Sequence, residues 1–248
     1  MKKHRYFIRL SYNGTRYSGW QIQPNGNTVQ AELTKALSLI LSLPDLSVVG
    51  AGRTDAGVHA RNFYAHFDSP RQLVDFENIV YKLNGFLPYD IAVHEIFPVK
   101  DDMHSRFSAL RRTYNYYITT EKDPFKLDTA LYLYGNLDLE AMNKAAALLL
   151  EYKDFTSFSK LHTQVKTNIC CVYSAQWRKE DAMLIFEISA DRFLRNMVRA
   201  IVGTLLQVGK GKLTIDGFRH IIEARDRSRA GESAPALGLF LTHIEYRL

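Results

Sequence analysis

The stretch that decides the fold is Gly50-Ala51-Gly52-Arg53-Thr54-Asp55-Ala56-Gly57-Val58-His59-Ala60. Residues 46–49, Leu-Ser-Val-Val, are typical of a short strand, and residues 60–67 alternate well enough to form the next one. Asp55 is therefore predicted to lie in a tight turn between two strands. Glycines at positions 50, 52 and 57 would let the backbone pass close to a ligand without clashes at Cβ.

A plain turn is the simplest interpretation of this motif, because Asp-Ala-Gly is good turn chemistry. A phosphate-binding loop does not fit the spacing. A Rossmann fingerprint would need its third glycine where Asp55 stands, and no Gly-Lys-Ser or Gly-Lys-Thr follows for a P-loop. Only the complete run from Gly52 to His59 favours a functional site.

The composition is that of a folded protein, and the charge suits a polyanionic partner. The chain has 248 residues, 46 % hydrophobic and 12 % aromatic, which is enough for one large domain or two small ones sharing a core. Lys plus Arg number 32 and Asp plus Glu 26, which gives a net charge of +6 and a pI near 9.2. Such an excess suits nucleic acid, although many basic proteins never bind it.

The cysteines and the N-terminal residues indicate the cellular compartment in which the protein works. Cys170 and Cys171 are adjacent, so a disulfide between them would be strained, and two thiols are too few for a structural zinc site. Residues 1–9 are basic without the apolar core of a signal peptide, and no apolar run approaches transmembrane length. The sequence predicts a soluble cytoplasmic protein with idle or buried thiols and no contact with membranes.

The first part of the chain predicts a β-α-β-β-α-β order. Residues 6–12 read as a strand, and apolar residues from Val29 to Leu41 recur at helical spacing. Asn27 is the predicted cap of that helix, with Gln30 reaching back as in a capping box and Pro44 closing it. The elements expected next are the strands at 46–49 and 60–67, a helix at 75–83 and a strand at 91–98.

The second part predicts a similar succession. A strand is expected at 114–119, a helix capped by Asp138, a hairpin of 169–178 with 183–190, and a long apolar helix over 193–208 that ends at Gly209. Thr214 opens a further helix, and residues 239–246 supply a last strand. Two split β-α-β halves, with a boundary near residue 108, would explain this order.

The run from Gly52 to His59 resembles the catalytic loop of the TruA family of tRNA pseudouridine synthases. Seven further segments are similar to motifs of that family and follow in its order, whereas residues 161–172 match less well and carry no assignment. These segments are Tyr12–Gln23, Asn84–Ile91, His104–Ala109, Arg112–Tyr116, Asp154–Phe158, Phe193–Arg199 and Ala234–Leu239.

The resemblance implies an α+β fold of two ferredoxin-like, split β-α-β halves with a central, largely antiparallel sheet. Residues 1–108 would form an N-terminal subdomain that carries the catalytic aspartate loop. Residues 109–248 would form a C-terminal subdomain that carries a tyrosine and an arginine of the site. The active site would then lie in the cleft between the two halves.

The resemblance assigns the catalytic carboxylate to Asp55, as nucleophile. Pseudouridine formation breaks the bond from C1′ to uracil N1 and joins C1′ to C5, so nothing is oxidised and no water is added. We therefore expect no cofactor and no metal. The carboxylate must be ionised, and a nearby guanidinium would oppose the rise in pKa that burial brings.

Arg199 is the candidate for that guanidinium, because it stands where the family motif has its arginine. Arg195, one turn earlier on the predicted helix, is a candidate only for contact with RNA. Without the motif, both would be taken for solvated arginines on an outer helix face.

Tyr114 is the third predicted site residue, which in the family lies against the target base. Tyr116 shares its strand face and is the main rival, and packing is the ordinary role of tyrosines in strands.

Four other side chains near the loop have open interpretations. Arg53 is a candidate substrate-binding residue that would reach a phosphate or fill the gap left by a displaced uridine, although plain surface charge is the alternative. His59 and His66 lack a third ligand at workable spacing, so no metal site is predicted there. Trp20 would either stack on RNA or close one end of the core.

The resemblance implies an isomerase that converts uridines 38, 39 and 40 in the anticodon stem-loop of tRNA, as a homodimer in which one tRNA spans both chains. Two alternatives stay open: a synthase of the same fold acting on another uridine, and an RNA-binding module without catalysis. A glycoside hydrolase would need a second carboxylate beside Asp55, and the loop has none.

Overall fold

The computed structural model describes residues 3–160 and 167–247, so part of the weakly matching segment at 161–172 lies outside it. The chain divides into two compact units. Unit 1 comprises Met1–Leu110 and Leu241–Leu248, and unit 2 comprises Arg111–Phe240.

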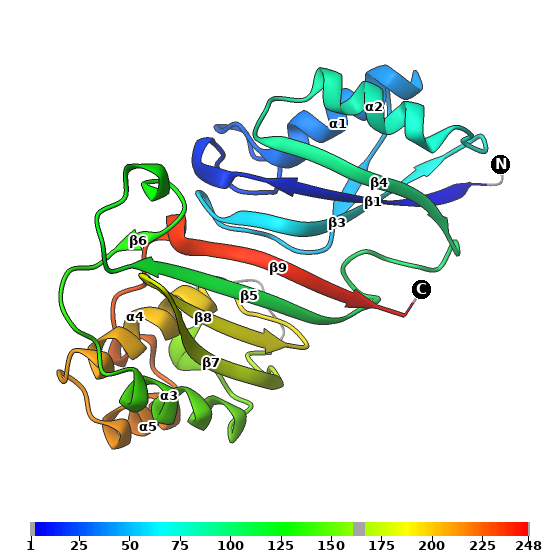
Figure 1. The fold of residues 1–248 in the computed structure, drawn as a ribbon. Helices are drawn as coiled ribbons and strands as arrows, with labels where there is room; N and C mark the ends of the chain where they lie inside the picture. The colour runs from blue at the N-terminus through cyan, green and yellow to red at the C-terminus, as the bar shows by residue number, and fades with distance from the viewer. Residues whose placement is uncertain (1–2, 161–166, 248) are drawn as a thin grey trace. The chain divides into compact units, whose positions relative to one another are not determined.

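Unit 1 contains the elements of the predicted β-α-β-β-α-β order (Figure 1). Strand β1 lies between β3 and β4 and is antiparallel to both, and β2 pairs with β3. The elements are β1 (His4–Tyr12), α1 (Val29–Leu41), β2 (Val48–Gly50), β3 (His59–Ser69), α2 (Phe76–Phe86) and β4 (Ile91–Val99). A single 3-10 turn, η1 (Gly14–Arg16), follows β1.

Unit 2 is built on strand β8, which pairs antiparallel with β5 on one side and β7 on the other. Its helices α3, α4 and α5 pack against one another, and α3 also packs against β7 (Figure 1). The elements are β5 (Ala109–Thr119), β6 (Leu131–Tyr132), α3 (Leu139–Ala147), β7 (Val172–Glu180), β8 (Met183–Ala190), α4 (Met197–Gly209) and α5 (Ile215–Ala224). The last strand, β9 (Leu239–Tyr246), begins in unit 2, and most of its residues belong to unit 1. Short 3-10 turns lie at 124–126, 148–150, 156–158, 227–229 and 236–238.

The strand pairings confirm a mixed α/β fold with a mostly antiparallel sheet. The pairings given above are all antiparallel, whereas β6 runs parallel to its partner β5. Strands β5 and β9 each begin in one unit and end in the other.

Helix α1 spans the predicted residues, but its predicted cap is wrong. Thr28, rather than Asn27, is the N-cap, and its hydroxyl accepts a hydrogen bond from Ala31 N at 3.4 Å. The Gln30 side chain does not reach back in a capping box. It accepts from Ile22 N at 2.8 Å and donates to Val48 O at 2.6 Å, so it joins the segment before the helix to β2.

Helix α4 begins later than the apolar pattern predicts. Asn196 has φ +65°, a left-handed conformation that cannot continue an α-helix, so the helix starts at Met197 and not at residue 193. Its predicted end at Gly209 is confirmed. Arg195 therefore lies before the helix, where it is exposed.

No helix in the described part of the chain combines the length and the apolar character needed to cross a membrane.

Candidate active site

The Asp55 loop, residues 51–58, connects β2 to β3 in unit 1. Ala51 N donates to Tyr64 O at 2.8 Å, which ties the beginning of the loop to β3. Val58 N donates to Asp55 O at 3.1 Å and closes the turn that carries the aspartate. Asp55 is half-buried, and Arg53 two residues earlier is exposed. The loop thus presents a carboxylate at a fixed point of the backbone.

The segment Asn13–Trp20 packs against this loop with its backbone. Gly57 N donates to Tyr17 O at 3.2 Å, and Trp20 N donates to Thr54 O at 3.3 Å. Gly14 N donates to His59 Nδ1 at 3.1 Å. Thr54, just before Asp55, and Gly57, two residues after it, are therefore both held by the same segment.

Two glycines make this close approach possible. A Cβ at Gly14 would lie 2.0 Å from the carbonyl oxygen of Val58, and one at Gly19 would lie 2.4 Å from that of Thr54. Gly19 also has φ +95°, a conformation that favours glycine. The motif at residues 12–23, to which the sequence assigns no mechanism, is thereby explained as the support of the Asp55 loop.

Trp20 is a core residue. It is 2 % exposed and its ring lies 4.2 Å from that of Phe63, measured between centroids. A Cβ at Gly50 would lie 2.3 Å from the Trp20 Nε1, so glycine is needed there too. Of the two interpretations left by the sequence, the structure supports closing one end of the core.

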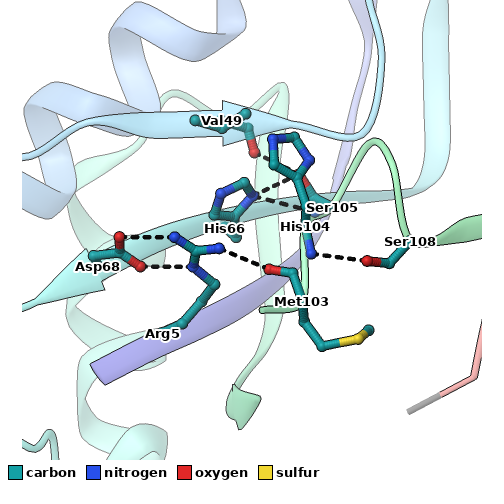
Figure 2. A network of polar contacts seen from close by, with 8 residues as sticks. All are labelled: Arg5, Val49, His66, Asp68, Met103, His104, Ser105 and Ser108. Atoms are coloured by element: carbon teal, nitrogen blue, oxygen red, sulfur yellow. Dashed lines mark hydrogen bonds and ion pairs between the residues drawn. The ribbon is translucent and has the colours of Figure 1, made fainter. Parts of the chain in front are cut away.

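The two histidines after the loop have structural partners. His59 is buried and accepts from Gly14 N, as above. His66 Nδ1 lies 2.8 Å from Ser105 Oγ and accepts from Ser105 N at 3.2 Å (Figure 2). Within residues 3–160 and 167–247, no group of three or more His, Cys, Asp or Glu side chains is placed to hold a metal ion.

Figure 2 shows the polar network around His66. Ser105 Oγ donates to Val49 O at 2.8 Å, and Arg5 donates to both carboxylate oxygens of Asp68 at 2.7 and 2.9 Å and to Met103 O at 3.0 Å. Burial, and secondarily the nearby His104 and Arg5, lowers the pKa of His66 to about 4. The network fixes the segment before β5 to strands β1, β2 and β3.

In unit 2, the two rival tyrosines of β5 have different environments. Tyr114 lies opposite Ile188 of β8 and is half-buried, with its ring edge-to-face against Phe193 at 5.1 Å. Tyr116 is fully buried, donates to Pro235 O at 2.8 Å, and has its pKa raised by burial. Tyr116 is therefore a core residue, which leaves Tyr114 as the tyrosine of this face that a substrate can reach.

Arg199, in the first turn of α4, is held by the segment 230–235. Its Nε donates to Ala234 O at 2.7 Å, and Ala234 N donates back to Arg199 O at 2.9 Å. A Cβ at Gly203 would lie 1.8 Å from Glu232 O, so this segment can cross α4 only over a glycine. The carbonyl of Ala234 thus fixes the Arg199 side chain, and the next carbonyl, that of Pro235, fixes the Tyr116 hydroxyl.

The structure places Arg53 and Asp55 in unit 1 and Tyr114 and Arg199 in unit 2. Sequence reasoning missed the carbonyl of Ala234 and the supporting role of residues 13–20, although both lie in segments that the family motifs single out. Cys170 and Cys171 are free thiols, and burial raises the pKa of Cys170 to about 12.

Comparison with known proteins identifies one family. The model of a family described as tRNA pseudouridine synthase matches residues 9–108 and 145–247. The chain is 57 % identical over 242 residues to tRNA pseudouridine synthase A of Parabacteroides distasonis, covering 98 % of this chain and 96 % of the relative. It is 41 % identical over 240 residues to the protein of the same name from Bacillus subtilis, covering 96 % and 97 %.

A solved structure of the CRISPR endoribonuclease Cse3 bound to 19 nt RNA matches at 12 % identity, with a TM-score of 0.22, over 83 % of this chain and 96 % of that one. We draw nothing from this match.

We predict that His66 makes the protein acid-sensitive. Its pKa is about 4 in the folded state and near 6.5 in the unfolded state. Between these two pH values the unfolded state therefore binds a proton that the folded state does not. The free energy of unfolding is therefore not reduced by His66 above about pH 6.5. It falls by up to about 3 kcal/mol as the pH drops through 4.

Urea unfolding of wild type and His66→Asn across this range tests the prediction. Asparagine keeps an acceptor near the Nδ1 position, and we expect the variant to lose most of the slope. His104 and His94, whose pKa values partial burial also lowers, account for what remains. An unchanged slope in His66→Asn would contradict the assignment.

Proposed function

The chain belongs to the tRNA pseudouridine synthase family, and from this premise we propose that it converts uridines 38, 39 and 40 of the tRNA anticodon stem-loop to pseudouridine. It is an isomerase that acts on uridine in tRNA, as relatives more than half identical over nearly the whole chain indicate. The observation that carries the mechanism is Asp55, a half-buried carboxylate on a turn whose residues before and after it are hydrogen-bonded to the segment 13–20.

Asp55 acts as the nucleophile of the isomerisation. It forms a transient covalent bond with the uridine while the C1′–N1 bond breaks and the uracil turns. The bond to Asp55 then breaks and frees the carboxylate, C1′ joins C5, the C5 proton leaves and N1 gains one. Reactants and product contain the same atoms, so the balance requires no oxidant, reductant or water. The loop supplies no second carboxylate that could replace Asp55.

The remaining site residues have complementary roles. Arg199 is the proposed catalytic arginine, and the hydrogen bond from its Nε to Ala234 O fixes the plane of the guanidinium. Tyr114 lies against the target base, with its ring angle set by Phe193. Arg53, exposed on the same loop as Asp55, contacts the RNA backbone or occupies the space that the uridine leaves.

The finer features of the family belong to the same proposal. The two units would correspond to ferredoxin-like halves, the first with Asp55 and the second with Tyr114 and Arg199. The protein would work in the cytoplasm as a homodimer that binds one tRNA across both chains. The formal charge of +6 supports binding of a polyanion.

We predict that Asp55→Asn abolishes pseudouridine formation and leaves tRNA affinity within a few-fold of wild type. Asparagine matches aspartate in size and can sustain the turn, but it cannot act as an anionic nucleophile. Phosphate contacts elsewhere dominate the affinity. Tritium release from tRNA labelled at uridine C5, with a filter-binding titration, measures both quantities.

The same assay separates the alternatives. Substantial tritium release by Asp55→Asn would remove Asp55 from the chemistry. Binding without release by the wild type as well would identify an RNA-binding module without catalysis.

Replacing Arg199 with lysine should lower turnover about tenfold or more, equivalent to about 1.4 kcal/mol in the barrier. Lysine keeps the charge but loses the planar group and the Nε donor to Ala234 O. Arg219→Lys is the matched control, because Arg219 is an arginine of α5 that pairs with Glu151. Equal turnover in the two variants would show that the guanidinium of Arg199 has no role in the reaction.

A further inference from the structure

Asp90, immediately before β4, binds three residues of the segment that supports the Asp55 loop. Its carboxylate accepts hydrogen bonds from Arg16 Nε at 2.7 Å and from the Tyr17 hydroxyl at 2.6 Å. Its main-chain carbonyl accepts from Asn13 N at 2.9 Å. We call Asp90, Arg16 and Tyr17 the Asp90 clamp.

The clamp is sheltered where it touches the supporting segment. The side chain of Asp90 is 14 % exposed and Tyr17 is 3 % exposed, whereas the Arg16 side chain is 69 % exposed. Burial, followed by the hydrogen bond to Asp90, raises the pKa of Tyr17 far above its ordinary value. The phenol therefore stays protonated and donates to the carboxylate.

The other end of Tyr17 contacts the Asp55 loop. Its main-chain carbonyl accepts from Gly57 N, two residues beyond Asp55. The neighbouring Gly14 donates to His59 Nδ1 and approaches Val58 too closely for a Cβ. A movement of Tyr17 would therefore displace the turn that carries the nucleophile.

The ion pair in the clamp has little value as a stabilising contact. An ion pair with a largely exposed guanidinium contributes little to folding free energy. A second pair in unit 1, Arg5 with Asp68, is bidentate, and its arginine is more shielded, at 20 % side-chain exposure, and also binds Met103 O. The two pairs are alike in chemistry, and only the Asp90 pair is joined to the loop through Tyr17.

We propose that Asp90 and Tyr17 are positioning residues that fix the Asp55 carboxylate for attack on the uridine. The proposal rests on the proposed function of Asp55. Asp90 acts through Tyr17, and Tyr17 acts through the Gly57 amide, so neither residue needs to touch the RNA. Loss of either should slow the chemical step and leave binding of tRNA unchanged.

The experiment compares Asp90→Asn, Tyr17→Phe and the double variant with the control Asp68→Asn, all in the full chain. Single-turnover tritium release with saturating enzyme gives the rate constant of the chemical step, and filter binding gives the Kd for tRNA. Hydrogen exchange of residues 51–58, followed by mass spectrometry, reports the loop without reference to activity. Urea unfolding checks that each variant is folded.

We expect each clamp variant to react about tenfold more slowly with Kd within twofold, and the double variant to be no slower than either single one. The loop should exchange faster in the clamp variants than in wild type or Asp68→Asn. The proposal would be overturned if the clamp variants reacted at the wild-type rate and their residues 51–58 exchanged as in wild type. An equal loss of rate in Asp68→Asn would also overturn it. A wild type that binds tRNA but forms no pseudouridine would overturn the proposed function. Hydrogen exchange of residues 51–58 would still show whether the Asp90 clamp fixes the loop.

Discussion

The backbone contact between residues 13–20 and the Asp55 loop is the constraint on which the rest of unit 1 depends. Strands β1, β3 and β4 bring their ends together there, since Tyr12 pairs with both Ala60 and Ile91. The loop is then fixed by main-chain hydrogen bonds and by glycines that permit contact without a Cβ. A carboxylate on such a turn is oriented before substrate arrives, which is what a nucleophile in a preorganised site requires.

Unit 2 also uses main-chain groups to fix Arg199, a candidate site residue. The segment before η6 (Ala236–Gly238) crosses α4 over Gly203, and its carbonyls hold the Arg199 guanidinium and the Tyr116 hydroxyl. Tyr116 stabilises this crossing from the core, while Tyr114, two residues earlier on β5, stays accessible. Main-chain carbonyls are suitable anchors because they are themselves fixed by the fold and carry no proton to lose.

Local patterns predicted most of the elements, because helical spacing, strand alternation and caps such as Thr214 are properties of neighbouring residues. Local patterns failed where contacts with distant residues determine the conformation. The Gln30 side chain binds Val48 O and not the helix cap, and the left-handed backbone of Asn196 makes α4 begin at Met197. Motifs named the candidate site residues, but Asp90 could not be assigned from sequence, since its partner Tyr17 is separated from it by 73 positions.

We propose that this chain makes pseudouridine in the anticodon stem-loop of tRNA. Mapping pseudouridine along the tRNA of cells with and without the gene for this chain tests this function. In the cells without the gene, we expect uridine at positions 38, 39 and 40 and unchanged pseudouridine elsewhere in tRNA. Unaltered pseudouridine at these three positions, or its loss from another position, would rule out the proposed substrate.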